Sequence, residues 1–273
     1  MDTDLSRQFT NPSVFICVHL WFSFPMIRAV SLDVAWTLIY PRESMWDIFA
    51  DVARQAGADV TAEQGETLVH SLMQAHRERA IAEVEAGTEY SDSDEEFMAQ
   101  FGLLGRLIFA AAGVPGDHGE LAARFMARFW TLENWALFPD VIDGLKRLRA
   151  HGIRTGVVSN ASSDLMAMLE VVGVLPHLDF TVISAIEGTR KPDRRIYARA
   201  VERAAVPADQ LVHAGDMYVE DILGPRTVGL RALLMDRGAQ SMFPHHPESE
   251  THAPGTIEVV RNFDELLPAI GVA

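Results

Sequence analysis

Residues 27–33 read Ile27-Arg28-Ala29-Val30-Ser31-Leu32-Asp33, a short and mostly apolar run that ends on a carboxylate. Such a run, with its β-branched residues Ile27 and Val30, predicts a buried β-strand. Residues 153–158 and 211–214 are similar runs, which end in Ser159-Asn160 and Gly215-Asp216. Stretches with helical periodicity separate these strands, so we predict an α/β fold with a doubly wound parallel sheet.

One long insert interrupts this alternation of strands and helices. Residues 43–136 contain four stretches with 3.6-residue periodicity, which predicts an all-helical insert. Residues 26–42 and 137–273 then form the α/β part. Its other strands are expected at 180–184 and 230–235, and its helices at 139–150, 163–172, 193–204, 218–228 and 263–270.

Composition narrows the classes of partner. The chain has 273 residues, of which 48% are apolar, so it can bury a large core and is not disordered. Its net charge of −15 disfavours nucleic acid and anionic membranes as partners. A single cysteine, Cys17, cannot form an intramolecular disulfide, which fits a cytoplasmic protein. A monomer and a homodimer both remain open.

The first 25 residues differ from the rest. The apolar run at 14–24 is shorter than the roughly 20 residues that a membrane-spanning helix needs. We expect residues 1–25 to be an extension outside the core, with Met26 as the initiating methionine; a cryptic targeting segment is the alternative.

Two further groups of residues are interpreted as structural. The loop at 238–256 is rich in Gly, Pro, Ser and His, and we expect its histidines to be solvated rather than metal ligands: His245, His246 and His252. Aromatic residues near the end of the insert are expected to pack it against the sheet: Trp130, Trp135 and Phe138.

Polar side chains follow several of the predicted strands. Asp33, Ser159 and Asp216 each come at the end of a strand, and Lys191 lies in the loop after 180–184. Alone, each is compatible with an ordinary turn or helix cap. Because ligands of parallel α/β sheets bind beyond the carboxyl ends of the strands, we expect all four to converge on one crevice.

This set of groups is suited to phosphoryl transfer. Asp33 and Asp216 repel each other unless a cation lies between them, which predicts a hard divalent ion, Mg²⁺. An aspartate can act as a nucleophile towards phosphorus. Ser159 and Lys191 can bind phosphoryl oxygens, and Asp221 can hold a metal-bound water or orient Lys191. A small phosphorylated molecule is therefore the expected substrate.

The same residues resemble the four motifs of the haloacid dehalogenase-like hydrolase superfamily. The resemblance extends over about residues 27–270, with the insert in the place of that family's cap domain and a Rossmann-like core. The matching stretches are Asp33-Val34-Ala35-Trp36-Thr37, Val158-Ser159-Asn160, Lys191-Pro192-Asp193, and Gly215-Asp216 with Asp221.

The resemblance implies a role for each matching residue. Asp33 would be the nucleophile and a metal ligand, and Asp216 the other principal ligand. The backbone carbonyl of Ala35 would complete the protein's ligands, with Asp221 binding directly or through water. The phosphate and the aspartyl-phosphate would be held by Thr37, Ser159, Asn160 and Lys191.

Two positions depart from the family pattern. Family phosphatases carry a general-acid Asp where this chain has Ala35, and a glycine where it has Trp36. General acid catalysis contributes about 10²–10⁴-fold, or roughly 3–5.5 kcal/mol of barrier. Alkyl phosphates should therefore be poor substrates, whereas acyl and aryl phosphates, which have better leaving groups, should be accepted.

Three other functions are compatible with parts of this pattern. The related phosphonoacetaldehyde hydrolases need a cap lysine, and residues 43–136 contain none. The 2-haloacid dehalogenases carry an aromatic residue at the position of Ala35 and no acidic residue at the position of Asp216. A non-enzymatic binding protein is favoured by Ala35 but disfavoured by the presence of Asp33, Lys191 and Asp216. A weak phosphohydrolase remains the preferred interpretation.

Overall fold

A six-stranded parallel sheet forms the centre of the fold. The computed structural model describes residues 26–242 and 257–272, so the predicted extension at 1–25 and the three histidines of the 238–256 loop lie outside the described residues. The strand order is β5-β4-β1-β6-β7-β8. The strands are β1 (Ala29–Leu32), β4 (Arg154–Ser159), β5 (Phe180–Ile183), β6 (Leu211–Gly215), β7 (Arg231–Met235) and β8 (Glu258–Val260).

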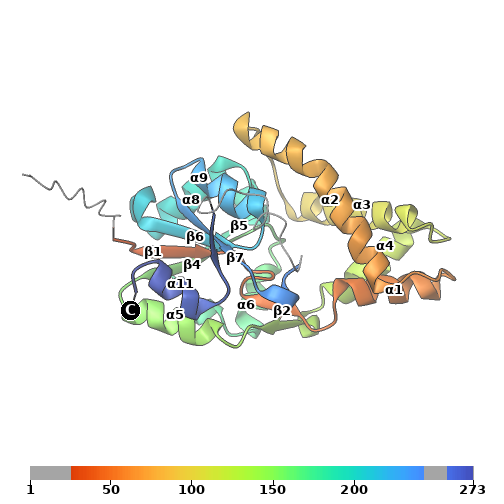
Figure 1. Ribbon diagram of the computed structural model, residues 1–273, viewed down its shortest axis with the longest axis horizontal. Helices are drawn as coiled ribbons and strands as arrows, with labels where there is room; N and C mark the ends of the chain where they lie inside the picture. The colour runs from red at the N-terminus through yellow and green to blue at the C-terminus, as the bar shows by residue number, and fades with distance from the viewer. Residues whose placement is uncertain (1–25, 243–256, 273) are drawn as a thin grey trace, which may run out of the picture.

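Helices cover both faces of this sheet, as predicted (Figure 1). On one face lie α5 (Val141–Ala150), α6 (Leu165–Val171) and α11 (Phe263–Ala269), and on the other α8 (Arg194–Ala204) and the short α9 (Gly224–Arg226). The side chains of β1 alternate between the two apolar clusters: Val30 and Leu32 pack on the α5 side, and Ala29 on the α8 side. The prediction of a doubly wound α/β fold is confirmed.

Because β1 pairs with both β4 and β6, the order of the strands reverses at β1. Such a reversal opens a crevice beyond the carboxyl ends of the strands. The sheet therefore positions its candidate site at the end of β1.

Some short elements differ from the sequence prediction. The helix expected at 218–228 is instead a π-helical turn, η4 (Tyr218–Leu223), followed by α9. Pro225 has no N–H to close the regular bond to the carbonyl four residues earlier. The three-residue strands β2 (Ile39–Pro41), β3 (Trp135–Leu137) and β8 were not predicted, because three residues carry too little periodic pattern.

Four helices occupy the predicted insert. They are α1 (Met45–Gln55), α2 (Ala62–Glu85), α3 (Asp94–Ala111) and α4 (His118–Phe129), and we refer to them together as the helical unit. Each begins with a polar side chain that caps its first turn: Ser44, Thr61, Ser93 and Asp117. The antiparallel pair of β2 and β3 joins both ends of the unit to the α/β part (Figure 1). The assignment of 43–136 as a cap stays a prediction.

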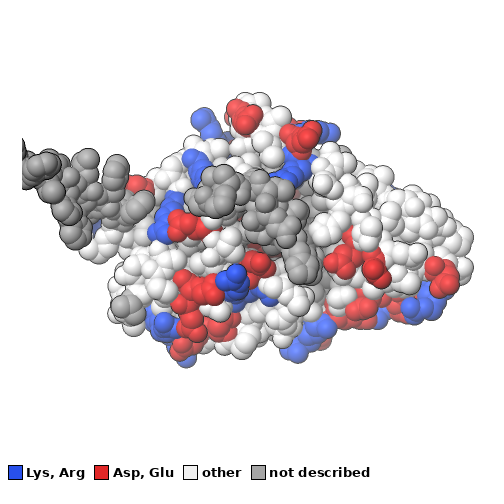
Figure 2. Space-filling view, in the orientation of Figure 1, with Lys and Arg blue, Asp and Glu red and all other residues white. Residues whose placement is uncertain are grey.

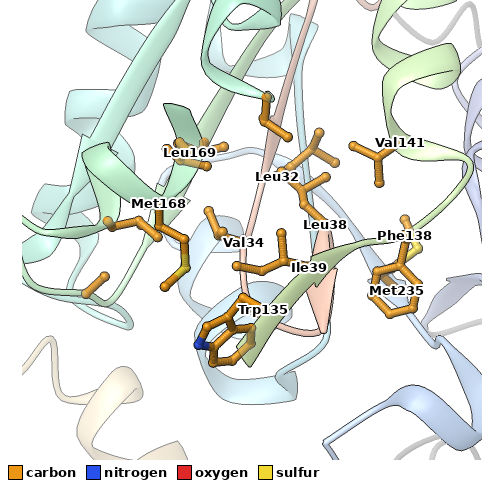
Figure 3. Packing of buried hydrophobic residues seen from close by; sticks show 14 of the residues in the cluster. Leu32, Val34, Leu38, Ile39, Trp135, Phe138, Val141, Met168, Leu169 and Met235 are labelled. Carbon is orange, nitrogen blue, oxygen red and sulfur yellow. The ribbon is translucent and has the colours of Figure 1, made fainter. Parts of the chain in front are cut away.

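Aromatic rings fill the junction between the helical unit and the sheet. Trp130 stacks on Trp135 with ring centroids 5.2 Å apart, and Phe129 meets Trp135 edge-on at 5.3 Å. Trp135 and Phe138 are buried in the same apolar cluster as Leu32 of β1, and Figure 3 shows the Trp135 ring beside Ile39. The predicted packing role of these aromatic residues is therefore confirmed.

The surface carries its charges unevenly. On the face drawn in Figure 2, acidic and basic side chains are interspersed along the lower edge, whereas the upper right, over the helical unit, has few charges.

Among residues 26–242 and 257–272, no helix combines the length and apolarity that crossing a bilayer requires.

Polar contacts also connect the helical unit to the α/β part. The carboxylate of Asp94, at the start of α3, accepts hydrogen bonds from the Ser163 amide and hydroxyl, both at 2.7 Å. The carboxylate of Asp193, before α8, accepts from the Tyr90 amide at 2.8 Å and from the Arg195 guanidinium. These contacts fix the loop between α2 and α3 beside the stretch Lys191-Pro192-Asp193.

Replacing Asp193 by Asn should cost stability in a pH-dependent way. Burial acts to raise the pKa of Asp193, but Arg195 and the Tyr90 amide outweigh it and hold that pKa below its usual value of 3.8. The ionised group therefore stabilises the fold above that pH, and the benefit is lost as the pH falls through the lowered pKa. Asn keeps the helix cap through its one side-chain oxygen, which accepts from the Arg195 amide, but it loses the charge and the second acceptor oxygen, which binds the Tyr90 amide and the Arg195 guanidinium.

We expect Asp193→Asn to lower the free energy of unfolding by about 1–3 kcal/mol at neutral pH, a difference that shrinks towards zero in acid. Urea unfolding of both proteins over a series of pH values measures it. A difference that stays constant with pH would show that the charge is irrelevant.

Candidate active site

Asp33 lies at the end of β1, where its amide donates to the Ala214 carbonyl of β6 at 2.9 Å. The Nζ of Lys191 is 2.7 Å from Oδ1 of Asp33 and 2.7 Å from Oδ1 of Asp221. All three side chains are almost completely buried. The ammonium group therefore bridges two carboxylates that come from opposite ends of the sequence.

Asn160 fixes the backbone of Lys191. Its side-chain oxygen accepts from the Lys191 amide at 2.7 Å, and its Nδ2 donates to the Lys191 carbonyl at 3.0 Å. We predicted that Asn160 binds phosphate, but the structure places its amide on the lysine loop. One N–H of the amide is left for a ligand, so its main effect is to position Lys191.

Asp221 is held from three sides. Its Oδ2 accepts from the Met217 amide at 2.9 Å, and its Oδ1 is 3.0 Å from Nε2 of His213 as well as in contact with Lys191. A Cβ at Gly215 would lie 2.3 Å from the Asp221 carboxyl carbon, so only glycine permits this approach. These contacts orient Asp221 towards Lys191, one of the two roles expected for it.

His213 was missed by the sequence analysis. It is fully buried in β6 and joins Asp221 to the hydroxyl of Ser31 in β1, which is 2.9 Å from its Nδ1. The available signal was a histidine within a run otherwise apolar enough for a buried strand. Buried polar groups need partners, so such a residue indicates a hydrogen-bond network.

Asp216 completes a cluster of three carboxylates. One oxygen each of Asp33, Asp216 and Asp221 lies within 4.8 Å of the others. Oδ2 of Asp216 is buried and has no hydrogen-bond partner among the described residues. Ionisation of all three carboxylates would leave a net charge of −2 in this buried site, −3 from the carboxylates and +1 from Lys191, unless a further cation binds.

The electrostatics of the cluster are uneven. Burial, and then the charges of Asp33 and Asp221, raise the pKa of Asp216 well above its usual value. Burial also raises the pKa of Asp33, although Lys191 partly offsets it. Burial acts to raise the pKa of Asp221 too, but Lys191 and His213 outweigh it and lower that pKa. Likewise, Asp221 and Asp33 outweigh burial at Lys191 and raise its pKa.

These residues fit a divalent cation. The excess negative charge, the partnerless oxygen of Asp216 and the all-oxygen donor set are what a hard ion such as Mg²⁺ prefers. Asp33 and Asp216 are the natural ligands, because both oxygens of Asp221 already have protein partners.

The loop after Asp33 is shaped by two further features. Trp36 has a φ of +55°, a left-handed conformation that favours glycine, the residue expected there in the family. Its ring lies edge-on to Trp135 at 5.7 Å, which secures the loop to the aromatic junction. The buried hydroxyl of Thr37 has no hydrogen-bond partner among the described residues.

Arg237 holds the far end of this loop and was also missed. Its guanidinium donates to the Thr37 carbonyl at 2.7 and 3.1 Å and to Asp140 at 2.8 Å, and it lies 4.3 Å over the Phe138 ring. Arg237 follows β7, outside the four motifs, and nothing in its local sequence marks it.

The remaining predicted residues lie at the same edge. Ser159 is buried at the end of β4, which pairs with β1, and Ala35 is partly buried two residues after Asp33. The structure therefore gathers the predicted residues at the end of β1, with direct contacts among Asp33, Lys191, Asn160 and Asp221.

Comparisons with known proteins agree with this arrangement. The model of the haloacid dehalogenase-like hydrolase family matches residues 27–229. The chain is 34% identical, over 77% of its length and 86% of the relative, to the haloacid dehalogenase-like hydrolase domain-containing protein 3 of Danio rerio. Residues 213–218 of this chain, His213-Ala214-Gly215-Asp216-Met217-Tyr218, resemble the subgroup that contains this protein.

More distant proteins share the fold. A glyceraldehyde 3-phosphate phosphatase of Methanopyrus kandleri is 28% identical over 86% of this chain and 98% of the relative. The solved structure of the defluorinating L-2-haloacid dehalogenase Rha0230 has a TM-score of 0.61 and 19% identity, covering 89% of this chain and 95% of that one, which shows a common fold alone. The chain belongs to the haloacid dehalogenase-like hydrolase family.

Proposed function

We propose that this protein is a magnesium-dependent phosphohydrolase that acts on small phosphorylated molecules through an aspartyl-phosphate at Asp33. The observation that carries the proposal is the buried cluster in which Lys191 bridges Asp33 and Asp221 while Asp216 keeps a partnerless oxygen. The name of the phosphatase relative from Methanopyrus kandleri supports the same class of reaction.

In the first step, Asp33 supplies the nucleophile. The carboxylate oxygen not engaged by Lys191 attacks phosphorus, the bond from phosphorus to the leaving oxygen breaks, and its electron pair stays on that oxygen. Lys191 and Ser159 donate to the phosphoryl oxygens, together with the hydroxyl of Thr37. Asp33, Asp216 and the Ala35 carbonyl would hold Mg²⁺, which would supply positive charge and so reduce the repulsion between the carboxylates and the phosphate.

In the second step, water attacks phosphorus. The bond between phosphorus and Asp33 breaks, the carboxylate is regenerated, and dihydrogen phosphate leaves with both hydrogens of that water. Lys191 stays paired with Asp33 and Asp221 and stabilises the restored carboxylate. Atoms and charges balance over the two steps.

Ala35 sets the choice of leaving group. Since it cannot donate a proton, the leaving oxygen must depart as a stable anion, and this favours acyl and aryl phosphates. The same residue favours a second candidate function, a binding protein on a catalytically weak scaffold. A haloacid dehalogenase is less favoured, because that class carries an aromatic residue at the position of Ala35 and no acidic residue at the position of Asp216.

The proposal extends to the setting of the reaction. The helical unit would act as a cap that opens and closes over the crevice and excludes water. The cytoplasm is the proposed location, and neither nucleic acid nor a membrane surface is a proposed partner, since the net charge is −15.

Asp216→Asn should abolish metal binding and leave the fold intact. Its raised pKa means that folding favours the protonated group, so the metal-free wild type loses stability as the pH rises above 3.8 through the raised pKa. The variant lacks this loss and should be the more stable protein at neutral pH without metal.

Added magnesium should stabilise the wild type, by about 2.7 kcal/mol at a concentration one hundred times Kd, and leave Asp216→Asn unchanged. Thermal unfolding with a chelator and with magnesium measures both effects. Equal shifts in the two proteins would place the ion elsewhere.

Asp33→Asn should abolish turnover, because the amide cannot form the covalent intermediate. We expect a loss of about 10⁴-fold or more in kcat with an aryl phosphate and magnesium. Asp209→Asn, an exposed site before β6, is the matched control and should retain activity. Equal and negligible rates in wild type and Asp33→Asn would favour the binding protein.

Ala35→Asp should restore a general acid. Turnover of alkyl phosphates should rise by about 10²-fold or more, whereas that of aryl phosphates should change little. Ala35→Asn introduces a side chain of about the same volume as Asp but without an acidic proton, so its turnover of alkyl phosphates should not rise. If a folded, magnesium-binding Ala35→Asp protein gains nothing, residue 35 is not beside the leaving group.

A further inference from the structure

Arg237 is a buried cation whose hydrogen bonds go to the protein's own chain. Its side chain follows β7 and is almost completely buried. Nε and Nη2 donate to the Thr37 carbonyl, and Nη1 donates both to the carboxylate of Asp140 and to the Arg261 carbonyl. These bonds occupy four of the five N–H groups of a guanidinium, so the group is built to hold the chain rather than to bind substrate.

The same guanidinium joins the two places where the chain passes between the α/β part and the helical unit. Thr37 precedes β2, which leads into the unit, and Asp140 follows β3, which leads out of it. Phe138 lies between β3 and Asp140, and its ring centroid is 4.3 Å from the guanidinium carbon. One side chain of the α/β part therefore fixes both passages.

The loop that follows Asp33 needs contacts from outside to keep its conformation. Trp36 has a φ of +55°, a conformation that costs free energy in any residue with a Cβ and persists only where the surroundings enforce it. The aromatic junction holds the Trp36 ring, and Arg237 holds the carbonyl of the next residue, Thr37. If the second contact is weakened, we expect the turn to open more often.

We propose that Arg237 is a positioning residue, which holds the loop that follows Asp33 in the conformation that binds phosphate and acts on the phosphate through Thr37. The inference rests on the proposed function and deepens it. The carbonyl that Arg237 binds belongs to the residue whose buried hydroxyl has no hydrogen-bond partner among the described residues. Carbonyl and side chain share one Cα, so fixing the first restricts the direction of the second.

Lysine is the informative replacement for Arg237. It keeps the positive charge beside Asp140, but its ammonium group is a compact point charge without the planar fork of a guanidinium. It therefore cannot place two bonds on the Thr37 carbonyl while also reaching Asp140.

A double-mutant cycle tests whether Arg237 acts through Thr37. Calorimetry would measure the affinity for inorganic phosphate, with magnesium present, in the wild type, Arg237→Lys, Thr37→Val and the double variant. Arg237→Lys should weaken binding about tenfold in the wild-type background and less than about twofold in the Thr37→Val background, where the hydroxyl is already absent. Equal weakening in both backgrounds would overturn the proposal.

Arg231, at the opposite end of β7, is the matched control. Its guanidinium also pairs with a carboxylate, that of Glu258, and donates to a backbone carbonyl, that of Ala269 at 2.9 Å. Arg231→Lys loses the same fork at the end of the strand away from the candidate site, so it should keep the wild-type affinity for phosphate. Equal losses in the two variants would contradict a role specific to Arg237.

Hydrogen exchange tests the hold on the loop without any ligand. The amides of Leu38 and Ile39 donate to the Val34 carbonyl at 2.8 and 3.0 Å, so their exchange reports opening of the turn. In Arg237→Lys both should exchange about tenfold faster, an acceleration greater than that of the β4 amides in the same protein. Unchanged exchange, or the same acceleration in β4, would overturn the proposal.

Failure of the proposed function has a different signature. If the wild type neither binds phosphate with magnesium nor hydrolyses an aryl phosphate, the phosphohydrolase and the phosphate-binding part of the inference both fail, and hydrogen exchange still decides whether Arg237 holds the loop. If the wild type binds phosphate and Arg237→Lys binds it equally well, the inference alone fails.

Discussion

The shared ammonium group of Lys191 is the interaction on which the rest of the site depends. Three buried carboxylates within 4.8 Å of one another would repel strongly without it. The single positive charge of Lys191 cannot neutralise three carboxylates. Lys191 contacts Asp33 and Asp221 but not Asp216, and this difference gives the carboxylates different properties. Asp221 contacts Lys191 and His213, which lower its pKa and keep it ionised. Asp216 instead has an oxygen without a hydrogen-bond partner among the described residues and a raised pKa.

The surrounding fold maintains this arrangement through several independent constraints. The reversal of strand order at β1 brings Asp33 beside the ends of β4 and β6. Asn160 fixes the lysine loop, and the π-helical turn with Gly215 lets Asp221 approach. The loop that follows Asp33 is held at Trp36 by the aromatic junction and at Thr37 by Arg237. The aromatic junction thereby connects the helical unit to the loop that follows Asp33.

Much of this could be predicted from the sequence, and the limits have physical causes. Strand ends fall at polar residues, so Asp33, Ser159 and Asp216 could be placed at one edge from periodicity alone. His213 and Arg237 could not be assigned roles, because their partners are distant in sequence and the contacts depend on the folded sheet. The strands β2 and β3 are too short for periodicity to mark them, although their pairing is what closes the helical unit.

Crystals soaked with Mn²⁺ and measured at a wavelength with strong anomalous scattering would test the central claim most directly. The account predicts one anomalous peak between the side-chain oxygens of Asp33 and Asp216, with Lys191 still bound to Asp33 and Asp221. Two results would contradict the account. One is a manganese ion bound at another site while no anomalous peak lies between Asp33 and Asp216, and the other is a bound ion that has displaced Lys191 from both carboxylates.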